Sequence, residues 1–245
     1  MTAPTPFKVV LFDIDGTLLD AAGAGRAALD AAFHDLWSID GATAGIVFAG
    51  NTDPELVREM LTARLGINMP AIDEKMVTAV LSGYLQRLPE QLTQAQGFHL
   101  LPGVLPLLER LTSLRRVVLG LATGNLAPAA RLKLAKARLN RFFRTGGFGG
   151  DAPTRAGIVV VAIERVARII GSKPLRKNVF LVGDTVRDIK AARATGVVPV
   201  GVATGPDDVQ QLRAAGATIV LQSLDQPAEL LAALQPPGPG KREPQ

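Results

Sequence analysis

The feature that most constrains the fold is a series of short apolar runs, each ending in acidic, hydroxyl or glycine residues. The first run, Lys8–Phe12, is followed at once by two aspartates. A short continuous apolar run is typical of a strand buried on both faces of a parallel sheet. Further runs rich in branched residues, each predicted as a strand, lie at Arg116–Thr123, Asn178–Asp184, Val197–Gly205 and Thr218–Leu224.

Helical patterns separate these runs. They lie at Pro102–Ser113, Leu126–Ala137, Arg155–Ile170, Val186–Thr195 and Pro206–Ala215. Strands that alternate with helices predict an α/β fold with a doubly wound, Rossmann-like parallel sheet. Ligands of such sheets bind beyond the carboxyl ends of the strands, so the residues that follow each apolar run are the candidates for function.

The pattern between residues 18 and 96 is different, because helical stretches follow one another without a convincing strand. Helices are expected at Gly25–Trp37, Pro54–Leu65 and Asp73–Leu92. We predict a helical cap at 18–96, inserted into an α/β core formed by 1–17 and 97–235, with a flexible tail at 236–245. An insertion directly after the first strand can lie over the carboxyl edge of the sheet as a lid.

Composition excludes several classes of function. The chain of 245 residues contains no cysteine, so thiolate nucleophiles, thiolate metal sites and disulfides are excluded. The net charge of +5 is scattered and interleaved with acids, which disfavours a nucleic-acid partner. The apolar runs are too short to cross a bilayer and no signal-peptide pattern is present, so we expect a cytoplasmic protein without a membrane partner.

Two carboxylates follow the first predicted strand, within the segment Asp13–Thr17. If the chain turns at Gly16, the side chains of Asp13 and Asp15 can diverge and take separate roles. One can remain ionised as a nucleophile and ligand, while the other donates a proton. The alternative is an ordinary turn at the end of a strand, where aspartate and glycine are common.

A second acidic cluster follows the strand predicted at 178–184. Asp188 lies one helical turn beyond Asp184, which with Thr185 could simply cap the helix. Several carboxylates at one sheet edge repel one another unless a hard cation lies among them, and oxygen ligands suit Mg²⁺.

Thr123, Gly124 and Asn125 end another apolar run and begin a helix, so they can bind phosphate, although a helix cap is the alternative. A cation must then neutralise the phosphoryl oxygens. Arg155 is the first candidate, because it follows a glycine-rich loop and begins a helix. Other basic residues that could compete by position are Arg144, Lys173 and Lys177.

Together these residues resemble the haloacid dehalogenase-like hydrolase superfamily, and within it the phosphoglycolate phosphatase-like branch with a helical cap. Asp13–Thr17 is similar to the first motif, Thr123 to the second, and Gly183–Asp184 with Asp188 to the fourth. The third motif departs from the commoner Lys-Pro pattern, because Arg155–Ala156 stands there.

The resemblance implies a phosphatase in which Asp13 is the nucleophile and Asp15 the general acid and base. It implies Mg²⁺ held by Asp13, the carbonyl of Asp15 and Asp184, with Asp188 supporting the metal or orienting the basic residue. Thr123 would bind the phosphoryl group and Arg155 would supply the cation. Residues expected to contact substrate are Gly16, Thr17, Gly124, Asn125, Thr52, Asp53 and Arg26.

The expected substrate is a small phosphorylated metabolite, with phosphoglycolate favoured and sugar phosphates as the alternative. The acid at position 15 disfavours a true dehalogenase and a phosphonate-cleaving enzyme. A phosphomutase of the same superfamily stays open. A receiver-type phosphoacceptor domain is disfavoured by the chain length and the early insertion, and the chain is expected to be a monomer or homodimer.

Overall fold

The computed structural model describes residues 7–67 and 71–235, so the tail predicted at 236–245 lies outside the described residues. Its centre is a six-stranded sheet in the order β5-β4-β1-β6-β7-β8, in which every neighbouring pair is parallel. The strands are β1 (Lys8–Phe12), β4 (Val117–Ala122), β5 (Gly146–Gly147), β6 (Val179–Gly183), β7 (Val198–Val202) and β8 (Ile219–Leu221).

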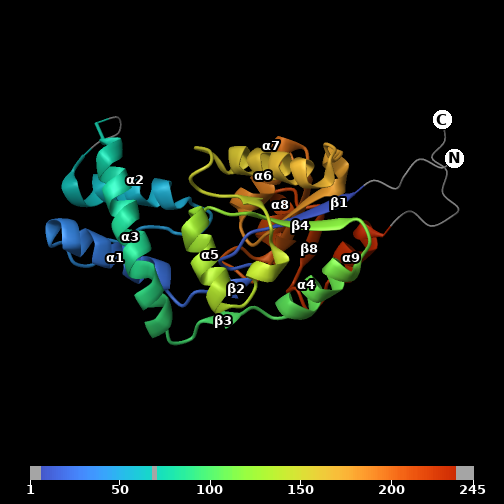
Figure 1. Ribbon diagram of the computed structural model, residues 1–245, viewed down its shortest axis with the longest axis horizontal. Coiled ribbons are helices and arrows are strands. Elements are labelled where there is room, and N and C mark those ends of the chain that lie inside the picture. The colour runs from blue at the N-terminus through green and yellow to red at the C-terminus, as the bar shows by residue number, and fades with distance from the viewer. Residues whose placement is uncertain (1–6, 68–70, 236–245) are drawn as a thin grey trace, which may run out of the picture.

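Helices cover both faces of this sheet (Figure 1). They are α4 (Val104–Ser113), α5 (Ala127–Lys136), α6 (Arg155–Ile170), α7 (Val186–Thr195), α8 (Val209–Ala214) and α9 (Ala228–Leu234). Val10 and Phe12 pack in one core cluster with α4, α5 and α9. Val9 and Leu11 point the other way, into a cluster with α6 and α7. The alternation along β1 therefore gives the two buried faces that its apolar sequence predicts.

The doubly wound sheet is confirmed, and differences from the sequence prediction lie in short elements. The glycine strand β5 was not predicted, because two glycines carry no strand propensity. The helix predicted from Pro206 begins only at Val209, since Asp208 caps it together with Gln211. The short helix α9 and the 3-10 helices η1 (Asn140–Phe142) and η2 (Arg176–Asn178) were also missed.

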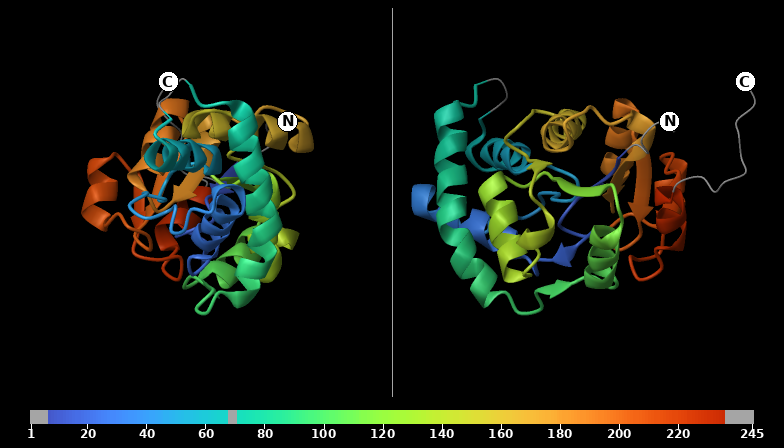
Figure 2. Two further views of the ribbon diagram at one scale, coloured as in Figure 1. Left: turned by 90° about the vertical axis from the view of Figure 1, so that its left-hand side faces the viewer. Right: turned by 45° about the vertical axis from the view of Figure 1, so that its right-hand side comes forward.

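Three helices lie to one side of the sheet, at the left of Figure 1 and at the left of the right-hand view of Figure 2. They are α1 (Ala24–Trp37), α2 (Asp53–Leu65) and α3 (Glu74–Gln94). Their buried side chains form one core cluster, with Phe33, Met60 and Tyr84 among its members, and Ala129 of α5 packs into it. Because this cluster differs from those of the sheet, we infer that the three helices form the cap.

The two chain segments that join cap and sheet pair with each other. Leu19–Asp20 (β2) runs antiparallel to His99–Leu100 (β3), with Leu19 opposite Leu100. Leu18 and Leu19 are buried in a core cluster of the sheet, so the cap helices begin a few residues later than the predicted boundary at 18. Within the described ranges, no helix is long and apolar enough to cross a membrane.

Candidate active site

Asp13 lies directly after β1, the strand between β4 and β6, at the carboxyl edge of the sheet. Its N–H donates to the Val182 carbonyl at 2.9 Å, and the residue is 6% exposed. Its Oδ2 lies 2.6 Å from Nη2 of Arg155. Burial raises the pKa of Asp13 to about 6, although the Arg155 charge and a hydrogen bond with the Thr123 side chain lower it. The site thus holds a buried carboxylate beside a fixed cation.

Asp184, the residue after β6, brings a second carboxylate to the same place. Ligand oxygens of Asp13, Asp184 and Asp188 lie within 4.8 Å of one another. Burial, followed by the charges of Asp13 and Asp188, raises the pKa of Asp184 well above its usual value. Thr17 donates to Asp184 Oδ1 at 2.8 Å. These acids therefore lie close together, as predicted. Thr17, which was expected to contact substrate, instead contacts Asp184 and does not line the cavity.

The chemistry of this cluster fits a hard divalent cation. Its donors are all carboxylate oxygens, and the guanidinium of Arg155 pairs with two of the three carboxylates, those of Asp13 and Asp188. Burial raises the pKa of both Asp13 and Asp184, and the charge of the neighbouring carboxylates raises it further. A buried acidic triad of this composition can bind a divalent metal.

Asp188 is fully buried and both of its oxygens are engaged. Its Oδ1 accepts from Nε and Nη2 of Arg155 at 2.9 and 2.6 Å. Its Oδ2 accepts from the Thr185 hydroxyl at 2.6 Å and from the Thr185 N–H at 3.2 Å, which closes the capping box of α7. Burial lowers the pKa of Arg155, but the carboxylates of Asp13 and Asp188 raise it by more than burial lowers it, so the guanidinium stays charged. Asp188 therefore orients Arg155 toward Asp13.

Thr123 lies beside Asp13 at the end of β4. It is fully buried, and its hydroxyl accepts from Nδ2 of Asn125 at 2.9 Å. The next residue, Gly124, packs against the cap, because a Cβ there would collide with the Asn51 carbonyl. The segment 123–125 therefore connects the acid cluster to the cap.

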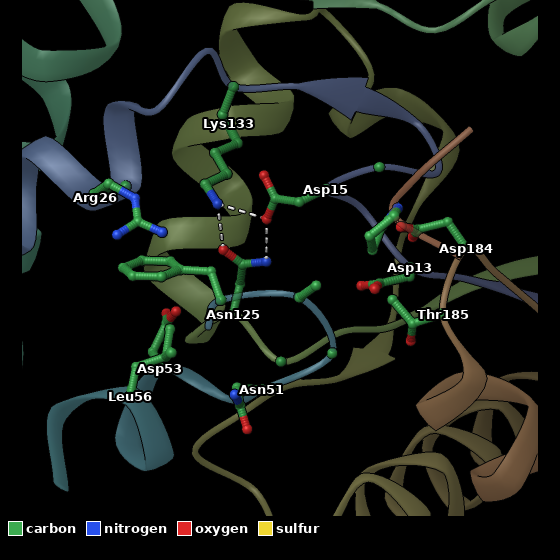
Figure 3. Close-up of a pocket in the computed structure, with 18 of the residues that line it drawn as sticks. Asp13, Asp15, Arg26, Asn51, Asp53, Leu56, Asn125, Lys133, Asp184 and Thr185 are labelled. Carbon is green, nitrogen blue, oxygen red and sulfur yellow. Dashed lines mark hydrogen bonds and ion pairs between the residues drawn. The ribbon is translucent and has the colours of Figure 1, made fainter. Parts of the chain in front are cut away.

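Asp15 points away from the acid cluster, as Figure 3 shows. Gly16 turns the chain with φ +77°, and a Cβ there would collide with the Asp184 carboxylate. Asp15 Oδ2 accepts from Nδ2 of Asn125 at 2.8 Å and from Nζ of Lys133 at 2.6 Å. The two aspartate side chains diverge as predicted, and the Asp15 carboxylate is not part of the acidic triad of Asp13, Asp184 and Asp188.

Lys133 was not predicted as a site residue. It lies on α5 and is 5% exposed, and its Nζ also donates to Asn125 Oδ1 at 2.6 Å. The available signal was its place on the helix, since it shares the buried face of α5 with Ala129, Ala130 and Leu134. A lysine on an otherwise apolar helix face requires a buried partner.

Two of the predicted cap residues have structural contacts. The Thr52 hydroxyl accepts from the Glu55 N–H at 3.2 Å and caps α2. Asp53 is buried and links the cap to the core: its Oδ2 accepts from the Leu126 N–H at 2.7 Å, and its own N–H donates to the Gly124 carbonyl at 2.9 Å.

Arg26, on cap helix α1, faces the same space. Its guanidinium donates to the carbonyls of Thr43 and Ile46 at 2.7 and 3.2 Å, and lies 4.1 Å from the ring centre of Phe48. Among the described residues, no carboxylate lies within ion-pair distance of it. Its charge therefore remains available to an anion in the cavity.

A cavity of about 290 Å³ lies between the cap and the carboxyl edge of the sheet (Figure 3). Of the predicted residues, those that line it are Asp13, Asp15, Gly16, Arg26, Asp53, Gly124, Asn125, Arg155 and Asp184. Thr17, Thr123 and Asp188 are not part of this lining but contact residues that form it. Thr52 is not part of the lining either, and its hydroxyl caps α2. Asp13 and Asp184 of the acid cluster therefore line the same cavity as Arg26 of the cap.

Comparison with known proteins places this geometry in a family. Residues 7–196 match the model of the haloacid dehalogenase-like hydrolases. The chain is 30% identical over 202 residues to the phosphoglycolate phosphatase of Pseudomonas syringae pv. syringae (strain B728a), covering 81% of this chain and 70% of that protein. It is 27% identical over 237 residues to the phosphoglycolate phosphatase of Escherichia coli (strain K12), covering 92% and 91%.

Solved structures show the same fold. A hydrolase from Pseudomonas syringae superposes with a TM-score of 0.68 at 21% identity, covering 94% of this chain and all of that chain. A predicted phosphoglycolate phosphatase from Haemophilus somnus gives a TM-score of 0.69 at 18% identity, covering 94% and 100%. The sequence resemblance is confirmed: the curated relatives named here are phosphatases, and the chain belongs to the haloacid dehalogenase-like hydrolase family.

Proposed function

We propose that this hydrolase is a Mg²⁺-dependent phosphatase that cleaves a small phosphorylated metabolite through a phosphoaspartate formed on Asp13. The observation that carries the proposal is the position of Asp13, which lies between the Arg155 guanidinium and the Asp184 carboxylate while Asp15 faces the cavity from the other side. Hydrolysis of a phosphate monoester requires an in-line nucleophile, neutralised phosphoryl oxygens and a proton for the leaving oxygen. Asp13 would supply the nucleophile, Arg155 and a bound metal ion would neutralise the phosphoryl oxygens, and Asp15 would supply the proton.

The reaction proceeds in two steps. A carboxylate oxygen of Asp13 attacks phosphorus, the bond to the ester oxygen breaks, and the leaving oxygen takes a proton from Asp15. Water then attacks the phosphorus of the phosphoaspartate, Asp15 takes a proton from that water, and Asp13 is released with phosphate. Arg155 holds the phosphoryl oxygens, and the hydrogen bond between Thr123 and Asp13 holds the nucleophile in place.

Asp13, Asp184 and the carbonyl of Asp15 would hold Mg²⁺, with Asp188 supporting the cluster. When bound, the ion neutralises charge on the phosphoryl oxygens and relieves the repulsion among the acids. Support for a metal here comes from the closeness of the three carboxylates and from the raised pKa of Asp184.

Phosphoglycolate is the favoured substrate. The curated relatives named above are phosphoglycolate phosphatases, and Arg26 offers at the cap end of the cavity a cation that pairs with no carboxylate of residues 7–67 and 71–235. A substrate with a carboxylate beside its phosphate ester would place that group toward this end. Sugar phosphates remain the second substrate class, and phosphomutase activity would appear as transfer of the phosphoryl group instead of its release. We also propose that the protein is cytoplasmic and is a monomer or a homodimer.

The test is release of inorganic phosphate from 2-phosphoglycolate, sugar phosphates and nucleotides, with Mg²⁺ and after chelation. We expect Mg²⁺-dependent release that is fastest with 2-phosphoglycolate, and lower kcat/KM for that substrate in Arg26→Met. The exposed Lys190→Met provides the control for loss of a cation elsewhere. Absence of release from every monoester would contradict the proposal, and a stable phosphoprotein without turnover would indicate a signalling role.

A further inference from the structure

Lys133 has no part in the mechanism described above, yet it is a buried lysine that contacts Asp15. It is 5% exposed on α5, where Ala129, Ala130 and Leu134 around it are fully buried. An ammonium group in such surroundings is strongly unfavourable unless carboxylate and amide oxygens receive its hydrogen bonds. The partners of Lys133 therefore indicate why it is there.

Those partners form a closed ring of hydrogen bonds. Lys133 Nζ donates to Asp15 Oδ2 and to Asn125 Oδ1, both at 2.6 Å. Asn125 Nδ2 donates to the same Asp15 oxygen at 2.8 Å and to the Thr123 hydroxyl at 2.9 Å. Lys133 thereby fixes the amide of Asn125 as well as the carboxylate of Asp15, as the dashed lines of Figure 3 show.

The ring engages one oxygen of Asp15 and leaves the other available. Oδ2 receives both hydrogen bonds, whereas Oδ1 accepts none from the part of the chain that the structure describes. Both side chains line the cavity, but that of Asp15 is 41% exposed and that of Lys133 only 6%. The oxygen that can reach a substrate is therefore Oδ1. Its orientation is fixed by the two hydrogen bonds that Oδ2 accepts.

We propose that Lys133 is a positioning residue, which holds Asp15 so that Oδ1 meets the ester oxygen of the substrate. This inference rests on the proposed phosphatase function and adds a residue to it. As the phosphoryl group passes to Asp13, the electron pair of the broken bond stays on the ester oxygen, and that oxygen takes the proton from Oδ1 of Asp15. Oδ2 keeps its two hydrogen bonds throughout, so the carboxylate does not turn toward the acid cluster.

The consequence is a dependence on the leaving group. An alkyl ester such as 2-phosphoglycolate or glycerol phosphate needs the proton, because an alkoxide is a poor leaving group. The ester p-nitrophenyl phosphate does not need it, since its phenolate leaves readily. Loss of Lys133 should therefore slow the alkyl ester much more than the aryl ester, whereas a general loosening of the site would slow both alike.

The experiment measures kcat/KM for both kinds of ester in the wild type, Lys133→Met and the exposed control Lys190→Met. This ratio reports the steps up to release of the leaving group. Since general acid catalysis contributes about 10²–10⁴-fold, we expect Lys133→Met to lose about 30–300-fold with the alkyl ester and less than about threefold with the aryl ester. In an Asp15→Asn background, Lys133→Met should cause little further loss with the alkyl ester, because its partner is already gone.

Equal losses with the two esters, no loss with either, or full additivity with Asp15→Asn would each overturn the role of Lys133. If Lys133→Met does not fold, Lys133→Gln keeps one donor for Asp15 and should show the same ester selectivity at a smaller loss. A wild-type protein that hydrolyses neither ester would instead refute the phosphatase function on which the inference rests. The two failures are therefore distinguishable.

Discussion

Asp53 in the cap and Leu126 in the core are joined by a buried hydrogen bond, in which the Leu126 N–H donates to Asp53 Oδ2 at 2.7 Å. The Asp53 N–H donates a second hydrogen bond, to the Gly124 carbonyl at 2.9 Å, so the start of α2 is held against the loop that follows β4. Burial raises the pKa of Asp53 to about 6, while the Lys133 charge and the Leu126 hydrogen bond lower it. The contact between cap and core therefore contains a carboxyl group that favours the protonated form.

This contact predicts a pH-dependent stability. Because the folded-state pKa of Asp53 is raised, its contribution to stability is fully present below the unfolded-state value near 4 and is lost as pH rises through 6. Asp53→Asn keeps an acceptor for Leu126 without the charge. Its unfolding free energy should exceed that of the wild type by about 1–3 kcal/mol at pH 7, and the gain should vanish near pH 4.

The measurement is chemical denaturation of both proteins between pH 4 and pH 7. Glu59→Gln, an exposed carboxylate on the same helix, serves as the control and should show no such trend. A difference between Asp53→Asn and the wild type that does not change with pH would contradict this account.

Asp13→Asn should abolish turnover, because an amide cannot form the phosphoaspartate, with a loss of more than about 10³-fold in phosphate release. The fold should persist, since burial raises the pKa of Asp13 to about 6 and a neutral side chain therefore suits this site. Phosphate release and thermal unfolding should be measured on the same preparation. Full activity in the variant would refute the nucleophile.

Asp15→Ala should separate catalysis from metal binding. Turnover of an alkyl ester should fall by about 10²–10⁴-fold because the proton donor is lost. Mg²⁺ affinity should change little, since the Asp15 carboxylate lies outside the triad of Asp13, Asp184 and Asp188. Calorimetric titration with Mg²⁺ would check this, and a large loss of affinity would show that the side chain ligates the metal.

Mg²⁺ should stabilise the wild-type protein by relieving repulsion within the triad. At a concentration about 100-fold above its Kd, the gain should be about 2.7 kcal/mol, seen as a higher unfolding temperature that chelation reverses. Asp184→Asn should lose most of this gain, while Asp208→Asn, at the exposed start of α8, should retain it. An equal response in both variants would place the metal elsewhere.

The sequence was sufficient to predict the strands that carry the site, because each is a continuous apolar run that ends in a polar residue. It also predicted the residues around Asp13, since the carboxyl ends of parallel strands meet at one edge. The pairing of Lys133 with Asp15 could not be predicted, because it depends on how α5 packs between the sheet and α3. Thr52 was assigned to substrate, although its position before Glu55 already matched a capping box.

The pairing of β2 with β3 gives the molecule a modular construction. The chain leaves the sheet domain at Leu19–Asp20 and returns beside itself at His99–Leu100, so the two covalent connections of everything in between lie side by side. A different set of helices could be grafted onto these two strands without interrupting β1 or displacing Asp13. Under the proposed function, replacement of this insert would then present other substrates to the same acid cluster.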